Sequence, residues 1–253
     1  MRIGSLATAM KIASLFLLVQ GVAAEAVEVN VLCTTAITST ASELFARFER
    51  ETGHKIVARY DFGVNLRRQV EAGETFDVAI LSLDVEDLVK QGKIAGGTRV
   101  VLGRTGIGVA VRKGAPKPDI STTDAFKRAL LNAKSISYSG GSSGPIILGL
   151  FDRLGIASDI KAKLKSSASV SVEDAIATGE PEIIVNGVAV ILRVPAAELV
   201  GWLPRELQSY VVFTGGVSVA AKEAEAGRSL LNFLTTPTAV ATLKAKGVEP
   251  VTP

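Results

Sequence analysis

The chain of 253 residues contains a single cysteine, Cys33, and a single histidine, His54. One cysteine cannot form an internal disulfide, and one histidine with one cysteine cannot complete a closed zinc site. Cys33 lies in an apolar, strand-like run, so we expect a buried and unreactive thiol. The acidic group Asp84, Glu86 and Asp87 lacks the spacing of a calcium loop and is typical of a helix start. We therefore expect neither a metal nor another cofactor.

A strong excess of charge is also missing. The formal net charge is +3, and two of the positive charges, Arg2 and Lys11, belong to the N-terminal segment. Without them, 26 basic side chains face 25 acidic ones. The basic residues are spread along the chain rather than clustered, so we expect neither a nucleic acid nor an anionic membrane surface as partner.

The N-terminal apolar run, residues 12–19, is well short of the roughly 20 residues that a membrane span needs. Positive charges precede this run and small residues, 21–24, follow it. This pattern predicts a cleaved secretory signal peptide over residues 1–24 and a mature chain that begins at Glu25 or Val27. We expect a periplasmic protein, and an uncleaved membrane anchor is the alternative.

Strand-like and helix-like segments alternate through most of the chain, which predicts an α/β fold with mostly parallel sheets. The length that remains after cleavage is sufficient for two lobes. Long extended segments at 99–113 predict the first crossing between the lobes, and 211–220 predicts the return. The apolar stretch 182–192 has β character, and Asn186-Gly187 within it predicts a turn.

Three loops rich in small and hydroxyl residues each follow a predicted strand and open a predicted helix: 34–39, 63–65 and 139–144. Ligands of open α/β sheets gather at the carboxyl ends of strands. Helix N-termini at such places present unpaired N–H groups and a positive dipole end, which favour anions. Ordinary helix capping is the alternative for any single loop. Their recurrence in both halves of the chain predicts an anion site in a cleft.

Longer motifs carry a resemblance to a known family. They are Val-Leu-Cys-Thr-Thr-Ala-Ile-Thr (31–38) ahead of Phe-Glu-Arg-Glu-Thr-Gly (48–53), Leu-Arg-Arg-Gln-Val-Glu-Ala-Gly (66–73) ahead of Phe-Asp-Val (76–78), and Gly-Ile-Gly-Val-Ala-Val-Arg-Lys-Gly (106–114). Their order resembles the periplasmic molybdate-binding proteins of ABC importers, and the similarity covers nearly all of the mature chain.

The resemblance implies an α/β, two-lobed type II periplasmic-binding-protein fold with two crossover hinge segments. Residues 25–108 and 211–253 would form the first lobe, and residues 109–210 the second. The implied function is capture of a small anionic ligand by closure of the lobes, followed by recognition of the closed form by an ABC permease in the cytoplasmic membrane. We expect a monomer without enzymatic activity. A sensing module that reports to a receptor is the alternative.

The chain departs from the family pattern at the ligand. Members of the family resemble one another in placing a serine in each of the first two loops, where this chain has Ala36 and Gly63. A tyrosine implied in the second lobe is also missing, and Asn186 or Gly187 lies at about that point. Hydroxyl and amide groups of the same loops offer substitute donors. The candidate ligand-binding residues are Thr34, Thr35, Ala36, Gly63, Val64, Asn65, Ser142, Ser143, Gly144 and Asn186.

These donors leave two ligand classes open, a molybdate- or tungstate-like oxyanion and a small carboxylate. A buried anion needs several donors to replace its hydration. A carboxylate could also pair with Arg67 or Arg68, although a solvated helix face is the simpler interpretation of those two side chains.

A hydrolase is the remaining alternative, because residues 140–144 satisfy the Gly-x-Ser-x-Gly pattern around Ser142. Such an enzyme needs a histidine after the serine in the chain, and His54 precedes it. The motif therefore favours a glycine-rich anion loop over a nucleophile.

Overall fold

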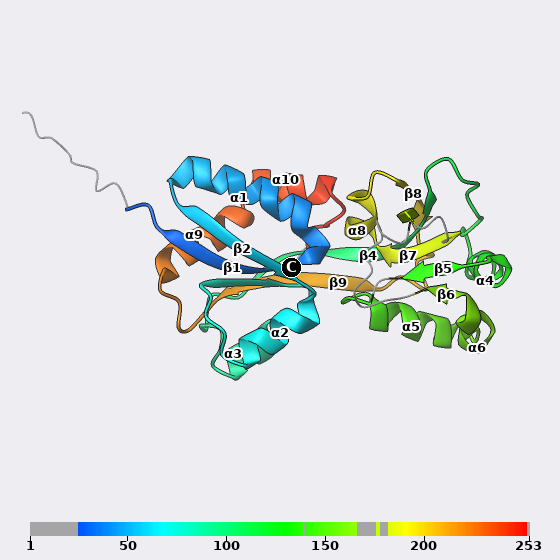
Figure 1. Ribbon diagram of the computed structural model, residues 1–253, viewed down its shortest axis with the longest axis horizontal. Helices are drawn as coiled ribbons and strands as arrows, with labels where there is room; N and C mark the ends of the chain where they lie inside the picture. Colours follow the sequence, from blue (N-terminus) through cyan, green and yellow to red (C-terminus); the bar gives the residue numbers. More distant parts are fainter. Residues whose placement is uncertain (1–24, 139, 166–175, 178–181, 252–253) are drawn as a thin grey trace, which may run out of the picture.

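The computed structural model describes residues 25–138, 140–165, 176–177 and 182–251. Its elements form two groups along the long axis of the molecule, and the strands β4 (Val100–Arg112) and β9 (Tyr210–Val217) lie at the middle (Figure 1). The predicted signal peptide lies outside the described residues. Among the helices of the described ranges, none combines the length and the apolar character needed to cross a membrane.

The first group contains three further strands and most of the longer helices. Its elements are β1 (Glu28–Thr34), η1 (Thr35–Ile37), α1 (Thr38–Thr52), β2 (Lys55–Asp61), α2 (Gly63–Glu71), β3 (Val78–Leu81), α3 (Glu86–Lys90), α9 (Ala224–Leu234) and α10 (Pro237–Ala245). β1 pairs in parallel with β2 and with β3, whereas β9 pairs antiparallel with β3 and β4. The carboxyl ends of β1, β2 and β3 therefore meet at one edge of the sheet.

The second group has shorter strands. Its elements are α4 (Thr123–Asn132), β5 (Ile136–Tyr138), α5 (Gly144–Arg153), α6 (Ala157–Ile160), η2 (Lys161–Lys163), β6 (Leu164–Lys165), β7 (Ile183–Gly187), α8 (Val188–Leu192) and β8 (Ala197–Trp202). β5 pairs in parallel with β6 and β7, while β7 and β8 pair antiparallel with β4. The predicted α/β fold is confirmed. The prediction that its sheets are mostly parallel was wrong, because every pair that involves β4 or β9 in the described ranges is antiparallel.

β4 belongs to both groups because it changes partners along its length. The part from Val100 to Gly106 pairs with β9, and the part from Ile107 to Arg112 pairs with β7 and β8. The predicted crossing at 99–113 contains this change of partners. We therefore propose that the lobes divide as predicted, with 25–108 and 211–253 in the first and 109–210 in the second.

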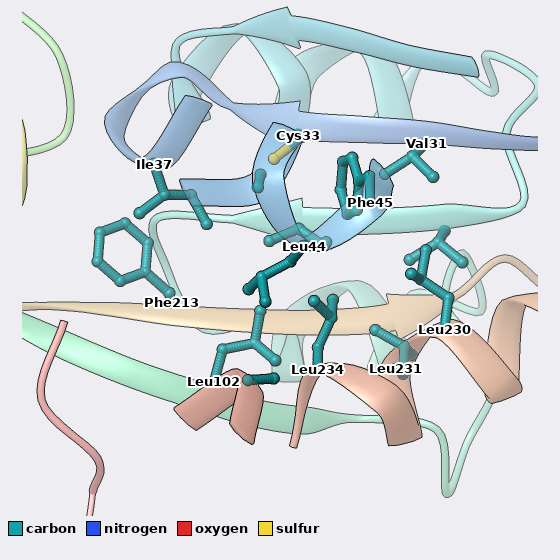
Figure 2. Packing of buried hydrophobic residues seen from close by; sticks show 14 of the residues in the cluster. Val31, Cys33, Ile37, Leu44, Phe45, Leu102, Phe213, Leu230, Leu231 and Leu234 are labelled. Atoms are coloured by element: carbon teal, nitrogen blue, oxygen red, sulfur yellow. The ribbon is translucent and has the colours of Figure 1, made fainter. Parts of the chain in front are cut away.

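The first group encloses a hydrophobic core between its sheet and its helices. Figure 2 shows side chains of β1, α1, β4, β9 and α9 gathered in one cluster, among them Phe45, Leu102 and Phe213. Burial of each such side chain stabilises the fold by about 1.5–3 kcal/mol. Cys33 lies in this cluster and is fully buried, and burial raises the pKa of its thiol far above the usual value. The predicted buried thiol is confirmed.

Two predicted boundaries were wrong. The loop 63–65 is the first turn of α2, which begins at Gly63 because the Asp61 carboxylate accepts a hydrogen bond from the N–H of Phe62 and another from the side chain of Asn65. The turn predicted at Asn186-Gly187 is instead the end of β7, and α8 follows directly.

The cause of the second error lies in α8. Val188, Val190 and Ile191 are β-branched and favour a strand by local propensity. In the folded protein the hydroxyl of Thr105 on β4 accepts a hydrogen bond from the N–H of Ala189, at 3.0 Å. This contact satisfies one of the free donors at the helix start, so tertiary structure overrides the propensity.

Candidate ligand-binding site

Two hydroxyl groups meet where β1 and β3 end. Thr34 is the last residue of β1 and Ser82 follows β3, and both are almost completely buried. The Thr34 hydroxyl donates a hydrogen bond to Ser82 Oγ at 3.1 Å and accepts one from the N–H of Ala36 at 3.4 Å. Because β1 and β3 are parallel neighbours, their carboxyl ends bring these two side chains together.

Ser142 extends this pair across to the second group of elements. Its hydroxyl is hydrogen-bonded directly to that of Ser82, which lies 60 residues away in the chain. Ser142 lies two residues before the start of α5. The hydroxyls of Thr34, Ser82 and Ser142 therefore form a continuous chain that joins the two groups.

Gly63 lies against the same hydroxyls. A Cβ atom added to it would stand 2.3 Å from Ser82 Oγ and 2.9 Å from Ser142 Oγ. Gly63 is the first residue of α2, so the N-terminal turn of this helix faces the junction. Backbone N–H groups of such a turn and the positive end of the helix dipole favour an anion there.

The second group adds a buried amide. Asn186 is the penultimate residue of β7, next to Gly187, and is fully buried. Its Oδ1 accepts a hydrogen bond from the Ser143 hydroxyl at 3.0 Å and another from the N–H of Gly187 at 2.8 Å. Its Nδ2 has no hydrogen-bond partner among the residues that the structure describes. Gly144 is buried beside Ser143 and its N–H donates to the carbonyl oxygen of Gly141, which closes the turn that opens α5.

The other predicted site residues lie beside the junction with their side chains engaged elsewhere or exposed. Thr35 and Ala36 lie in η1, and Ala36 packs against the first core. Val64 is 44% exposed. The amide of Asn65 donates a hydrogen bond to Asp61 at 2.9 Å. Of the predicted residues, the structure thus brings together Thr34, Gly63, Ser142, Ser143, Gly144 and Asn186.

Ser82 is the residue that sequence reasoning missed. It follows the apolar strand β3 as Thr34 ends β1, so a hydroxyl at the carboxyl end of a strand was the available signal.

Neither basic candidate joins the hydrogen-bonded cluster. Arg67 pairs with Glu71 at 2.8 Å and with Asp87 at 3.8 Å, and its hydrogen bond to Glu71 raises the pKa of the guanidinium.

The residues of a hydrolase are not assembled. His54 Nδ1 accepts a hydrogen bond from the N–H of Val27, just before the start of β1, whereas Ser142 lies at the carboxyl end of that strand. The part of the chain described by the structure also contains no cluster of three or more His, Cys, Asp or Glu side chains suited to a metal ion. The groups that converge on the junction are neutral hydroxyls, an amide and backbone N–H groups.

Two α/β groups that share a crossing strand and meet through strand ends and helix N-termini define a two-lobed solute-binding protein. The chain belongs to the family of bacterial extracellular solute-binding proteins, whose model matches residues 29–249. It is 31% identical over 229 residues to the aconitate isomerase of a Pseudomonas species, covering 88% of this chain and 87% of that protein. It is 26% identical over 240 residues to the molybdate-binding protein ModA of Azotobacter vinelandii, covering 89% and 91%.

Solved structures show the same fold. The periplasmic molybdate-binding protein of Azotobacter vinelandii superposes with a TM-score of 0.71 at 20% identity, over 89% of this chain and 99% of that one. The sulfate-binding protein SubI of Mycobacterium tuberculosis superposes with a TM-score of 0.69 at 14% identity, over 90% and 88%. The predicted type II periplasmic-binding-protein fold and the resemblance to molybdate-binding proteins are thereby confirmed.

Proposed function

We propose that this protein captures a small anion, a carboxylate or an oxyanion, between its two lobes outside the cytoplasmic membrane. The observation that carries the proposal is the hydrogen-bonded chain of Thr34, Ser82 and Ser142. In this chain, hydroxyl donors of both lobes lie next to one another. The N-terminal turns of α2 and α5 flank this chain. Hydroxyl and N–H donors around a closed junction can replace the hydration of an anion without a formal positive charge.

Capture then follows from closure of the lobes. A ligand that contacts Ser82 in one lobe and Ser142 in the other stabilises only the closed arrangement, so it shifts the population toward that form. We propose that an ABC permease recognises the closed, monomeric protein and accepts the anion for import. A receptor that senses the same closed form remains the alternative partner.

We propose a binding role without catalysis, because the converging groups include no proton acceptor suited to neutral pH. Hydroxyls and an amide can hold an anion, whereas acid–base chemistry needs a carboxylate, a histidine or a comparable group at the reacting atom. Such a group is absent from the hydrogen-bonded cluster within the described residues.

Isomerisation of aconitate is a second candidate function, and the 31% identity to an aconitate isomerase favours it. An allylic proton shift, one route between the cis and trans isomers, removes a proton from one carbon and returns a proton to another. This route requires a base outside the hydroxyl cluster. Incubation of the purified protein with cis-aconitate, followed by proton NMR, tests this function directly. Accumulation of trans-aconitate faster than in a protein-free sample would establish it.

A ligand screen tests the binding proposal. The mature protein, freed of copurified ligand by partial unfolding and refolding, is heated with molybdate, tungstate, sulfate, phosphate, citrate, aconitate or smaller carboxylates. A ligand of the native state raises Tm in a concentration-dependent manner. If none of these anions raised Tm, the result would contradict the proposal.

Substitution of Ser142 locates the site of any binding that the screen detects. We expect Ser142→Ala to weaken the stabilising anion about 10–100-fold in isothermal titration calorimetry, as one hydrogen bond to a charged ligand is worth about 1.5–3 kcal/mol. Ser229→Ala on the exposed face of α9 is the matched control. Equal affinities of the two variants would place the anion elsewhere.

A further inference from the structure

Asn186 is a fully buried amide of which one half is engaged and the other half is free. Oδ1 accepts two hydrogen bonds, from the Ser143 hydroxyl and from the N–H of Gly187. Nδ2 lies in the interior, and no group of the described part of the chain is hydrogen-bonded to it. Buried polar groups are nearly always hydrogen-bonded, so an unpaired donor at this depth indicates a partner that the protein itself does not supply.

The orientation of this amide is determined by its neighbours. The N–H of Gly187 can only donate, so the atom 2.8 Å from it must be the acceptor Oδ1. A flipped amide would place two donors against each other. Both hydrogens of Nδ2 are therefore available for an acceptor.

The position of Asn186 connects it to the proposed anion site. It lies at the carboxyl end of β7, and Ser143, to which it is hydrogen-bonded, is the immediate neighbour of Ser142 in the turn that opens α5. Ligands of α/β sheets gather at such strand ends. Within the described residues, the partners of this amide are the Ser143 hydroxyl and the N–H of Gly187, so no ionised side chain there competes with an anion for the donor.

We propose that Asn186 determines which anions this site accepts, by donating a hydrogen bond from Nδ2 to a ligand oxygen that carries no proton. This inference rests on the proposed anion-binding function and adds a selection rule to it. A carboxylate or oxo oxygen satisfies the amide. A ligand that presents a hydroxyl hydrogen or an ammonium group at this point leaves donors facing one another, which a buried site does not tolerate.

Asn186→Asp is the sharpest test, because it replaces the donor with an acceptor of nearly the same shape. One carboxylate oxygen can still accept the hydrogen bonds of Ser143 and Gly187, while the other faces the ligand and repels it. Molybdate and citrate are the two probes in calorimetry. For each probe that binds the wild type, we expect the affinity of Asn186→Asp to be lower by at least about 100-fold. Asn232→Asp, on the exposed surface of α9, is the matched control and should bind as the wild type does.

The outcomes separate the selection rule from the anion-binding function. Wild-type affinity in Asn186→Asp, or a loss no larger than that of Asn232→Asp, would overturn the role of Asn186 and leave the anion site standing. Failure of the wild type to bind either probe would overturn both for these anion classes.

A second measurement covers the case in which Asn186→Asp does not fold. The side-chain amide signals of Asn186 are followed by ¹⁵N NMR while the binding probe is added to the wild type. A donor that bonds to the ligand shifts strongly, whereas a merely structural amide keeps its position, and that result would overturn the proposal. Ser143→Ala should also weaken binding about 3–10-fold, since it removes one of the two contacts that orient the amide.

Discussion

At the residue scale, Gly63 and Ser82 are complementary. The family resemblance implies a serine at position 63, and the space that its side chain would take is filled here by Ser82 Oγ, 2.3 Å from the position of a Cβ on Gly63. The hydroxyl that is missing from α2 is thus supplied by the residue after β3.

Gly63→Ser should therefore weaken the site instead of restoring it. The added side chain would also stand 2.9 Å from Ser142 Oγ, so it must push the lobes apart, at a cost of about 1–3 kcal/mol. We expect the affinity for the stabilising anion to fall about tenfold or more in calorimetry. Gly96→Ser, where a Cβ would meet no atom within 4 Å, is the control. Tighter binding by Gly63→Ser would contradict the arrangement.

The predictable site residues were those with a local signal. Thr34 and Ser142 are hydroxyl residues between a strand and a helix, which the sequence displays directly. Ser82 carries the same signal in a weaker form, because a single serine after a strand is common. The free donor of Asn186 was not predictable from the sequence, since it depends on contacts with Ser143 and Gly187 that only the folded chain creates.

At the scale of elements, Asp77 fastens the start of α9 to the sheet. Its carboxylate accepts hydrogen bonds from the N–H groups of Lys222 and Glu223, at 2.8 and 3.0 Å, and from the N–H of Asn30 on β1 at 2.8 Å. Asp77 is buried, so water cannot reach these N–H groups to take the place of its carboxylate. One side chain thus joins β1, the segment before β3, and the C-terminal helices.

Asp77→Ala should lower the free energy of unfolding by about 2–4 kcal/mol, because it leaves several backbone donors unpaired. Urea unfolding followed by circular dichroism measures this change. Asp152→Ala, on the exposed side of α5, is the matched control and should unfold within about 0.5 kcal/mol of the wild type. A comparable loss in both variants would show that the contacts of Asp77 are not responsible.

Element types were predicted well where the pattern was periodic. The predicted alternation of strands and helices is present, for example, in the order β1, α1, β2, α2 and β3. The start of α2 and the whole of α8 were missed, because Asp61 and Thr105 supply the hydrogen bonds that determine them. These partners lie outside the helices that they stabilise, and no local pattern encodes them.

At the scale of the whole molecule, Ile146 connects the two lobes. It lies on α5 and packs against the core of the first group as well as that of the second. α8 lies against η1 in a similar way, and its residue Ala189 belongs to the first core. Apolar contacts therefore accompany the hydroxyl chain across the junction.

Ile146→Ala should weaken ligand binding more than it destabilises the fold. Loss of this contact destabilises the closed arrangement relative to the open one. If the free energy of closure rises by about 1 kcal/mol, the apparent affinity for the ligand falls about 3–10-fold. Calorimetry with the stabilising anion, and small-angle X-ray scattering for the lobe separation, provide the measurements. Leu148→Ala on the same helix, 41% exposed, is the control. A lower Tm of the free protein with unchanged affinity would assign Ile146 to folding alone.

The hydrogen bond between Ser82 and Ser142 has one more consequence, for the solutes that the protein ignores. Any anion that lies between these hydroxyls must first separate them, so the hydrogen bond between the two serines competes with the anion. A neutral hydrogen bond of this kind contributes about 0.5–1.5 kcal/mol, so the need to break it lowers the affinity for every solute up to about tenfold. Abundant solutes that offer only weak acceptors gain nothing from the exchange. We propose that a solute is held at this junction only where its hydrogen bonds to Ser82 and Ser142 are stronger than the one that it replaces.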